Sequence, residues 1–342
     1  MILRCVFLLA LLLTGCGQPK QQLHIYIWSE YIDPEIVADF ERQFDCKVTV
    51  DLYEDADSMI AKLGAGGASL YDIVVPSNLT VPGLVKRGLL APLRHQNISN
   101  LTNVSSAFRH LAFDPENAYS VPYQWGTTGL YLRRSKAKPV EETWGLLFEA
   151  SRQAGPFLMI DDARHCLGGA LKYKGHSLNS TNPAELLEAR DLILEAKKRS
   201  LGFEGTVGGK NRVLARGAVL AFVVNGDAAR GVTEDPETYY FVPREGGEIF
   251  LDTLSIPAQA PHRELAEKFI NFILDPKVGA RLSNFNQFAT PNQASLPFIN
   301  PTDLNNPAIY PPQAIRSQLE YANDLGDANK LYNEIWTQIK SR

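Results

Sequence analysis

Strand-like and helix-like patterns alternate along this chain, and their order constrains the fold more than any other feature. The first part shows, in order, an apolar strand pattern at 24–27, a helix pattern from Asp33, strand alternation at 47–53, a helix pattern at 56–63 and a buried strand pattern at 71–75. Asp followed by Pro is typical of a helix start. Strands separated by helices pair in parallel. We therefore predict an α/β fold with a parallel sheet covered by helices.

A second set of patterns predicts a second lobe. It comprises a strand at 157–160, a helix from Asp162, a long helix at 183–199 and a strand at 218–224. The segment 122–131 is predicted to cross between the lobes, and the strand 250–257 to return to the first lobe. Amphipathic helices are expected at 264–274 and 331–339. A chain of well over 300 residues is too long for one hydrophobic core, which favours two lobes.

The first sixteen residues have the charged start, short apolar middle and small-residue exit of a secretory signal. The apolar run Cys5 to Leu13 is too short to span a bilayer. Leu13-Thr14-Gly15-Cys16 resembles the bacterial lipoprotein signal, in which the cysteine is acylated and becomes the amino terminus; an ordinary secretion signal is the alternative. We predict a signal peptide at 1–15, a lipidated tether at 16–22, and a membrane-anchored location outside the bacterial cytoplasm.

The net charge and the cysteines limit which partners and which disulfide the protein is expected to have. Loss of residues 1–15 removes one basic residue, Arg4, so the formal net charge changes from −4 to −5. An acidic exported protein is a poor match to nucleic acid, which needs a basic face. Cys46 and Cys166, the two cysteines that would remain besides Cys16, are predicted to lie in different lobes. We expect no disulfide between them, because bridging requires Cα atoms within about 7 Å.

Enzyme motifs are scarce in the sequence. It has no Gly-x-Ser-x-Gly elbow, no His-Glu-x-x-His motif and no Walker loop. His165 and Cys166 are adjacent, and neighbours on a helix point in different directions, so they make a poor catalytic pair. An iron-binding protein is an alternative, because adjacent tyrosines such as Tyr239-Tyr240 can bind ferric iron. Alternation in a strand, however, would place the two rings on opposite faces. We predict a protein that is not an enzyme and needs no cofactor or metal.

The end of the first predicted strand has the chemistry of a cation site. Trp28-Ser29-Glu30-Tyr31 places two aromatic rings beside a carboxylate, and both groups attract ammonium ions. Further acids stand at predicted strand ends or helix starts, at Asp162, Asp227 and Asp252. Core aromatics and helix caps are the alternative interpretation. In parallel sheets, ligands bind beyond the carboxyl ends of the strands, so we expect these side chains to converge.

Several motifs taken together resemble the spermidine/putrescine-binding proteins of bacterial ABC importers, over nearly all of the mature chain. These motifs are Trp28-Ser29-Glu30-Tyr31-Ile32, Tyr71 to Ser77, Val121 to Gly126, Asp161-Asp162-Ala163-Arg164, Gly246 to Pro257, Thr290-Pro291-Asn292 and Ile309-Tyr310-Pro311-Pro312. The resemblance implies a two-lobed periplasmic-binding-protein fold of type II, each lobe a mainly parallel sheet flanked by helices. It implies lobe 1 at 23–126 and 253–298, and lobe 2 at 127–252 and 299–342.

The resemblance also implies a function and a site. The protein would capture a polyamine in the cleft between its lobes, as a monomer, and present it to a membrane permease driven by a separate ATPase. The acids would hold the ammonium groups, and Asp227 matches an acid of the putrescine-type members. The implied ligand-binding residues are Trp28, Ser29, Glu30, Tyr31, Ser77, Asp162, His165, Asp227, Phe250, Asp252 and Phe288.

The sequence departs from the family pattern at six positions around this site. Four of them concern aromatic residues: Leu79 and Val224 replace an aromatic residue, and Phe250 and Phe288 differ from the pattern in which aromatic residue is present. His165 replaces a glutamate, and Ala322 replaces a glutamine. Polyamine binding in weakened form, a different small ligand, and a polyamine-sensing module that docks to a membrane receptor all remain open. We expect His165 to gain a proton near pH 6.5 and then to repel a bound ammonium group.

Overall fold

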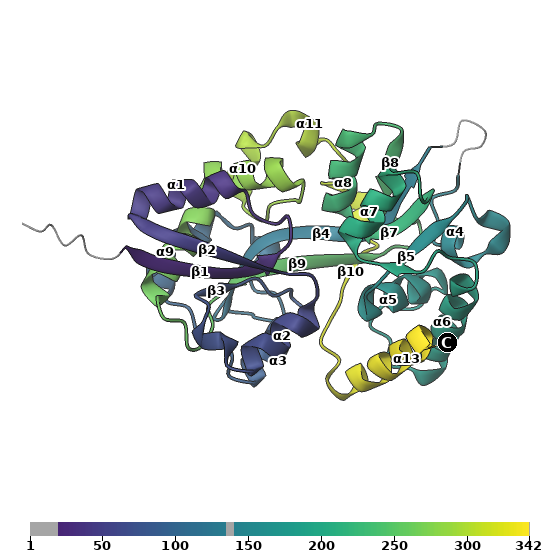
Figure 1. The fold of residues 1–342 in the computed structure, drawn as a ribbon, viewed down its shortest axis with the longest axis horizontal. Coiled ribbons are helices and arrows are strands. Elements are labelled where there is room, and N and C mark those ends of the chain that lie inside the picture. The colour runs from purple at the N-terminus through teal and green to yellow at the C-terminus, as the bar shows by residue number, and fades with distance from the viewer. Residues whose placement is uncertain (1–19, 135–139, 342) are drawn as a thin grey trace, which may run out of the picture.

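The structure, a computed structural model, describes residues 20–134 and 140–341 and shows two α/β lobes side by side (Figure 1). The strands are β1 (Gln21–Trp28), β2 (Cys46–Tyr53), β3 (Ile73–Val74), β4 (Ser120–Arg133), β5 (Phe157–Ile160), β6 (Phe203–Glu204), β7 (Leu220–Val224), β8 (Thr238–Phe241), β9 (Glu248–Ser255) and β10 (Glu320–Tyr321). The two-lobed α/β fold predicted from the sequence is confirmed.

Helices cover the strands of both lobes. They are α1 (Pro34–Phe44), α2 (Ala56–Gly64), α3 (Val81–Lys86), α4 (Gly145–Phe148), α5 (Ala163–Tyr173), α6 (Pro183–Lys197), α7 (Thr206–Leu214), α8 (Asn225–Glu234), α9 (Arg263–Ile273), α10 (Pro276–Asn286), α11 (Pro301–Leu304), α12 (Gln313–Arg316) and α13 (Asn329–Ser341). None of the helices within the described ranges is long and apolar enough to cross a membrane. The predicted signal peptide and Cys16 lie outside these ranges, and the last two residues of the predicted tether, 21–22, begin β1.

The strands form one continuous sheet in the order β2-β1-β3-β9-β4-β7-β5-β6, with β8 paired to β4 and β10 to β9. At one end β1 pairs in parallel with β2 and β3, and at the other end β5 pairs in parallel with β6 and β7. The predicted parallel pairing is therefore confirmed in each lobe. The antiparallel pair of β4 and β9 in the middle joins the two lobes, and the sequence patterns did not predict it.

The first lobe follows from the alternation of β1. Leu23, Ile25 and Ile27 point to one face of the sheet, where they pack with apolar residues of α1 and α9. Tyr26 points to the other face and packs against residues of α2 and α3. Successive side chains of a strand lie on opposite faces, so a strand buried on both faces needs apolar residues at every position. Helices consequently cover both faces of this lobe.

The second lobe is built in the same way around the far end of β4. Leu130 and Leu132 pack with α4, α5, α6 and α13, whereas Tyr131 packs on the opposite face with residues of α7 and α8. Cys46 and Cys166 are free, buried thiols that belong to the separate cores of the two lobes.

The chain passes between the lobes three times. β4 and β9 make the first two passages, and the third lies between α10, which packs in the first lobe, and α12, which packs in the second. Phe250 of β9 packs in the core of the first lobe. The residue ranges given above for the lobes stay a prediction, since the long strands β4 and β9 belong to both.

Candidate ligand-binding site

A cavity of about 440 Å³ lies between the lobes at the carboxyl ends of the parallel strands. Trp28 is the last residue of β1, Ser77 follows β3, and Asp162 follows β5 and caps α5. Asp227 lies in the first turn of α8, directly after β7. Strand ends of both lobes thus contribute to one cavity, as ligand sites in open α/β sheets generally do.

The structure brings together ten of the eleven residues predicted for the site. The cavity is lined by Trp28, Ser29, Tyr31, Ser77, Asp162, His165, Asp227, Phe250, Asp252 and Phe288. Glu30 is the exception: it lines a separate surface groove with residues of α7 and α8. The roles of these residues toward a ligand stay a prediction, because what the structure describes is their placement.

Asp252 is a deeply buried acid of the cavity lining. It is 6% exposed, and its Oδ2 accepts a hydrogen bond of 2.6 Å from the Tyr31 hydroxyl. Burial raises the pKa of Asp252 to about 7, although the Tyr31 hydrogen bond and the nearby His165 oppose the rise. A cation placed beside this carboxylate would favour its ionised form. The Asp252 carboxylate therefore lacks a positive partner, which a bound cation would supply.

His165 does not have the properties expected from the sequence. Its Nδ1 lies 2.6 Å from Oε2 of Glu248, which is 6% exposed. Burial lowers the pKa of His165, but the Glu248 and Asp162 carboxylates outweigh that effect and raise it to about 9. The expectation that His165 titrates near pH 6.5 is wrong, because the sequence did not reveal the Glu248 partner. His165 carries its proton throughout the neutral range.

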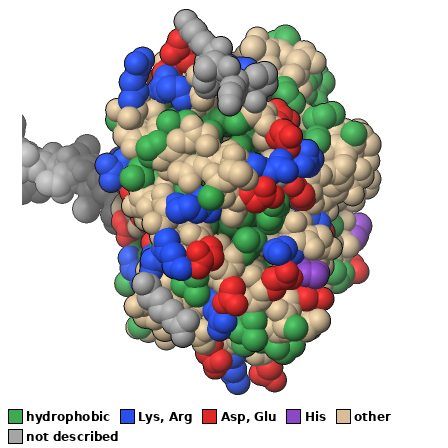
Figure 2. Space-filling model, turned by 90° about the vertical axis from the view of Figure 1, so that its right-hand side faces the viewer, with side chains coloured by type: hydrophobic (Ala, Val, Ile, Leu, Met, Phe, Trp, Pro, Cys, Tyr) green, Lys and Arg blue, Asp and Glu red, His purple; other side chains and the backbone are tan. Residues whose placement is uncertain are grey.

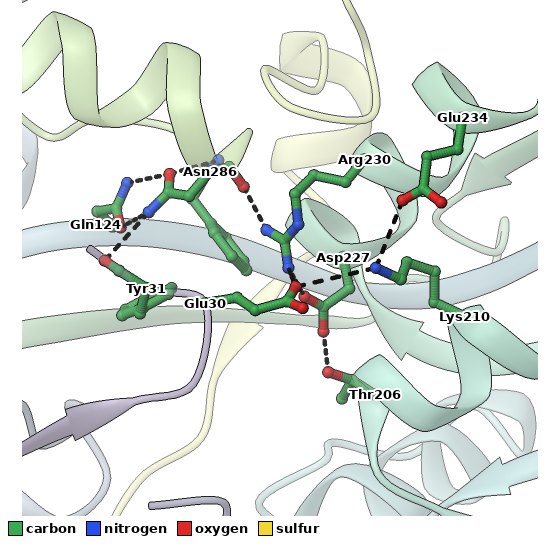
Figure 3. Close-up of polar contacts among 10 residues, drawn as sticks. Glu30, Tyr31, Gln124, Thr206, Lys210, Asp227, Arg230, Glu234 and Asn286 are labelled. Carbon is green, nitrogen blue, oxygen red and sulfur yellow. Dashed lines mark hydrogen bonds and ion pairs between the residues drawn. The ribbon is translucent and has the colours of Figure 1, made fainter. Parts of the chain in front are cut away.

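Glu30 and Asp227 share a cation that belongs to the protein (Figure 3). Nη2 of Arg230 donates to Oε2 of Glu30 at 2.7 Å and also to Oδ1 of Asp227. Nζ of Lys210 lies 3.9 Å from the same Glu30 oxygen. The backbone of Glu30 is left-handed, with φ of 55°, and its carboxylate lies among residues of α7 and α8. The other Asp227 oxygen accepts from the Thr206 hydroxyl.

Aromatic rings form the apolar walls of the cavity. The Trp28 ring lies 4.4 Å from that of Tyr53, and its Nε1 donates to a backbone carbonyl at 3.1 Å. Phe288 packs edge-on against Tyr31, with 4.9 Å between ring centroids, and lies 6.2 Å from Phe250. These contacts fix the rings and leave apolar faces beside the carboxylates, a combination that suits an alkyl ammonium ion.

Sequence reasoning missed Glu248, although a signal for it existed. Residues at alternate positions of a strand share a face, so Glu248, Phe250 and Asp252 of β9 all point into the cavity. Of the positions that depart from the family pattern, Leu79 and Val224 line the cavity as well. Ala322 is buried, and its carbonyl accepts a hydrogen bond from Asn78.

Acidic side chains dominate the lining of the cavity. Eight of them face only one arginine and one histidine, Arg164 and His165; the acids are Glu54, Asp55, Asp161, Asp162, Glu204, Asp227, Glu248 and Asp252. Within residues 20–134 and 140–341, no group of three or more His, Cys, Asp or Glu side chains could hold a metal ion. Tyr239 and Tyr240 lie in β8, and the Tyr240 hydroxyl donates to the Thr127 carbonyl. The chemistry of the cavity thus favours an organic cation.

The outer face of the second lobe differs in character from the cavity. Figure 2 shows basic and acidic side chains interspersed over this face. Mixed signs of this kind produce no strong field over long distances. The concentration of negative charge is thus a property of the cavity and not of this outer surface.

Comparison with known proteins identifies the family. The sequence pattern of the bacterial extracellular solute-binding proteins matches residues 35–309. The chain belongs to this family. A putrescine/cadaverine-binding protein of Pseudomonas aeruginosa is 30% identical over all of both chains. The spermidine/putrescine-binding periplasmic protein of Salmonella typhimurium is 32% identical, with 93% of this chain and 91% of that one aligned.

The solved structures agree with the sequence relatives. A spermidine/putrescine ABC transporter structure from Listeria monocytogenes superposes with a TM-score of 0.88 at 31% identity, covering 94% of this chain and 99% of that one. The family resemblance predicted from the motifs is thus confirmed. In this solute-binding protein the acidic cavity lies between the two lobes, where strands from both converge.

Proposed function

We propose that this protein captures a polyamine of the putrescine or spermidine class in the cavity between its lobes and delivers it to the permease of an ABC importer. The observation that supports this most directly is Asp252, a buried carboxylate that lines an acidic cavity and has no basic side chain in hydrogen-bond contact among the described residues. The named binding partners of the relatives, putrescine, cadaverine and spermidine, are cations of the kind that this carboxylate requires.

The electrostatic contribution is large enough for a useful affinity. At an effective dielectric constant near 20, an ammonium group 4 Å from a carboxylate gains about 4 kcal/mol before the desolvation of both ions is subtracted. Micromolar binding requires a total of only about −8 kcal/mol. One good pair at Asp252, a second at Asp162 and the burial of a short methylene chain would together be of that order.

The aromatic walls would hold the methylene chain of the ligand. Trp28, Tyr31 and Phe250 present apolar surface next to the carboxylates. Each methylene group removed from water contributes about 0.8 kcal/mol. Closure of the two lobes around the ligand would exclude water and strengthen each ion pair.

The role is that of a transport component and not of an enzyme. A lipid anchor at Cys16 would hold the protein at the membrane surface, near a permease and its ATPase. Stable anchoring takes more than one acyl chain, as in the lipoprotein modification that the Leu13 to Cys16 motif predicts. A monomer suffices for this task, because both lobes that line the cavity belong to one chain.

A ligand other than a polyamine is the second candidate, and the cavity wall favours it at two positions. Leu79 and Val224 line the cavity where the resemblance implies aromatic residues. Replacing an aromatic wall with an aliphatic one removes roughly 1 to 3 kcal/mol of apolar and cation–π contact. Such a cavity would be wider, and it would accept an amine with a bulkier body.

Thermal shift followed by calorimetry on the chain without residues 1–22 tests the proposal. We expect putrescine, cadaverine or spermidine to raise the melting temperature and to bind with micromolar or tighter dissociation constants. Glutamate, glucose and sulfate serve as controls without an alkyl ammonium chain and should have no effect. If none of the three amines bound, the polyamine proposal would be wrong, while the family membership would stand.

A further inference from the structure

Arg230 is buried among the groups that would otherwise receive the ligand's positive charge. Its side chain is only 17% exposed. Besides Glu30 and Asp227, it reaches the backbone carbonyl of Asn286, which accepts from Nη1 at 2.6 Å. Its guanidinium lies 6.0 Å from the ring centroid of Phe288, which lines the cavity. The guanidinium thus makes the contacts that a bound ammonium group would make: two carboxylates, a carbonyl and an aromatic ring (Figure 3).

These contacts join the two lobes. Arg230 and Asp227 belong to α8 of the second lobe, whereas Glu30 follows β1 and Asn286 ends α10 in the first lobe. A guanidinium holds several oxygens at once because its donors are planar and rigid. The Asp227 carboxylate is 6% exposed, so its pair with Arg230 is little screened by water, whereas the Glu30 carboxylate is 45% exposed and its pair contributes less. The arrangement is therefore an organised cation site that the protein fills with its own side chain.

This pairing reduces the number of acids that are free to bind a ligand. Of the four acids that the sequence indicated as partners of ammonium groups, Arg230 pairs with two, Glu30 and Asp227. The other two, Asp162 and Asp252, have no Arg or Lys partner among the described residues. Three further acids of the cavity also lack such a partner in the described ranges: Glu54, Asp55 and Glu204. Glu248, by contrast, is paired internally, with protonated His165. A third ammonium group near Arg230 would meet a like charge.

We propose that Arg230 acts as a resident cation that neutralises Asp227 in the wall of the cavity and so disfavours a ligand that would place a third ammonium group there. This inference rests on the proposed function and makes it more specific: the ligand is a diamine rather than a triamine. Arg230 is then a specificity-determining residue. Like-charge repulsion beside the buried Asp227 is strong enough to discriminate between ligands by about tenfold.

The first test compares two amines on the unmodified protein. Calorimetry with putrescine and with spermidine should give a dissociation constant at least about tenfold lower for the diamine. Equal or tighter binding of spermidine would overturn the inference and leave the proposed function intact. Failure to bind either amine would overturn the proposed function, and the inference would fall with it.

Two substitutions then test the charge of Arg230 itself. Arg230→Gln removes the charge and should shift the preference toward spermidine by about tenfold, because Glu30 and Asp227 become available. Arg230→Lys keeps a positive charge and should retain the preference for the diamine. Arg281→Gln is the matched control, since Arg281 also pairs with several carboxylates, those of Asp33, Glu35 and Asp39, but lies away from the cavity.

The two variants of Arg230 show whether its charge or its packing sets the preference between the amines. An unchanged preference in a folded Arg230→Gln protein, confirmed by circular dichroism, would contradict the inference. So would a shift in Arg230→Lys as large as that in Arg230→Gln, because packing and not charge would then set the preference. If Arg230→Gln does not fold, the comparison of the two amines on the unmodified protein still decides the matter.

Discussion

At the scale of single residues, the site is governed by which carboxylates already have a positive partner. Arg230 pairs with Asp227 and Glu30, and His165 pairs with Glu248. Asp252 has only the Tyr31 hydroxyl, and burial raises its pKa to about 7. A bound cation would stabilise the ionised carboxylate, so we expect Asp252 to contribute strongly to the binding free energy.

Replacing Asp252 with Asn tests that statement directly. The amide keeps the size of the side chain but not its charge, so the variant should lose about 2 to 5 kcal/mol of diamine binding, which abolishes detectable binding of a micromolar ligand. Isothermal calorimetry with putrescine measures the loss. Asp191→Asn, at an exposed position of α6, is the control and should bind as the unmodified protein does. Unchanged affinity in Asp252→Asn would rule out the cation site.

The pH dependence of binding should follow Asp252. Tyr31, His165 and Glu248 are the titratable groups that influence its pKa, which burial raises to about 7. Below pH 7 the carboxyl group becomes protonated and neutral, so diamine affinity should fall by about tenfold between pH 8 and pH 6. His165 stays protonated over this range, because its pKa is raised to about 9.

A variant of His165 distinguishes the titration of Asp252 from that of the histidine. The positive charge of His165 lowers the pKa of Asp252, so His165→Gln should move the midpoint of the pH profile upward while keeping its shape. Calorimetry at intervals between pH 5.5 and 8.5 measures the profile. A profile that became flat in His165→Gln would show that the histidine itself titrates, contrary to this account.

At the scale of secondary-structure elements, pairing and packing determine where the site residues lie. β9 places alternate residues on the cavity face, and α5 and α8 begin at the cavity. The amides of Gln124 and Asn286 bond to each other at 2.6 and 2.8 Å and so tie β4 to α10. Asn286 also donates to the Tyr31 carbonyl at 3.3 Å. Figure 3 shows these contacts, which hold the Tyr31 segment in place; the Tyr31 hydroxyl in turn donates to Asp252.

The start of α8 depends on a glycine. A Cβ atom at Gly226 would lie 2.4 Å from ring carbons of Phe288, which is buried. Gly226→Ala should therefore displace the ring or the helix, lower the free energy of unfolding by about 1 to 3 kcal/mol, and weaken amine binding. Urea unfolding and calorimetry measure the two effects.

Gly83→Ala in α3 is the control for that substitution. A Cβ atom at Gly83 would meet nothing within 4 Å, and alanine is favoured over glycine within a helix by about 0.5 to 1 kcal/mol. Gly83→Ala should be at least as stable as the unmodified protein and bind equally well. Equal stabilities of the two variants would contradict the packing argument for Gly226.

At the scale of the whole molecule, the long strands β4 and β9 run from one lobe into the other and pair with each other between them. Helices pack on both faces of the sheet in each lobe, so each lobe has its own core. Motion of the lobes would therefore change the cavity more than it changes either core. The ion pair of Arg230 with Glu30 connects the two lobes directly.

The attachment of the molecule to a membrane can be tested in the full chain. Cys16→Ser should remove the acylation site and release the folded protein into the soluble fraction, because the acyl chains would be its attachment to the membrane. Fractionation of cells followed by immunoblotting measures the distribution. Cys46→Ser, which alters a buried cysteine of the first lobe, is the control and should remain with the membranes. Retention of Cys16→Ser on membranes would refute the lipid anchor.

The sequence by itself determined many of the elements and their order. Asp33 caps α1, and the strands and helices that were predicted lie close to their predicted positions, whereas α3, α7 and α10 were not predicted. These features depend on neighbours within a few residues, through capping, periodicity and alternation, so they can be read locally. The strand predicted at 71–75 is shorter in the structure, at Ile73–Val74, because pairing with β1 and β9 and not residue type defines its ends.

The tertiary structure alone decided the electrostatics of the site. The acids at strand ends were predicted to converge, but nothing local to Glu30 indicates Arg230, which lies 200 positions along the chain. Likewise, the carboxylate of Glu248, 83 positions away, raises the pKa of His165 to about 9 from the ordinary value near 6.5 that was expected. Charge interactions depend on distance and burial in space and not on separation in sequence. The sequence therefore predicted which groups form the cavity, and only the fold decided which of them are free to bind a ligand.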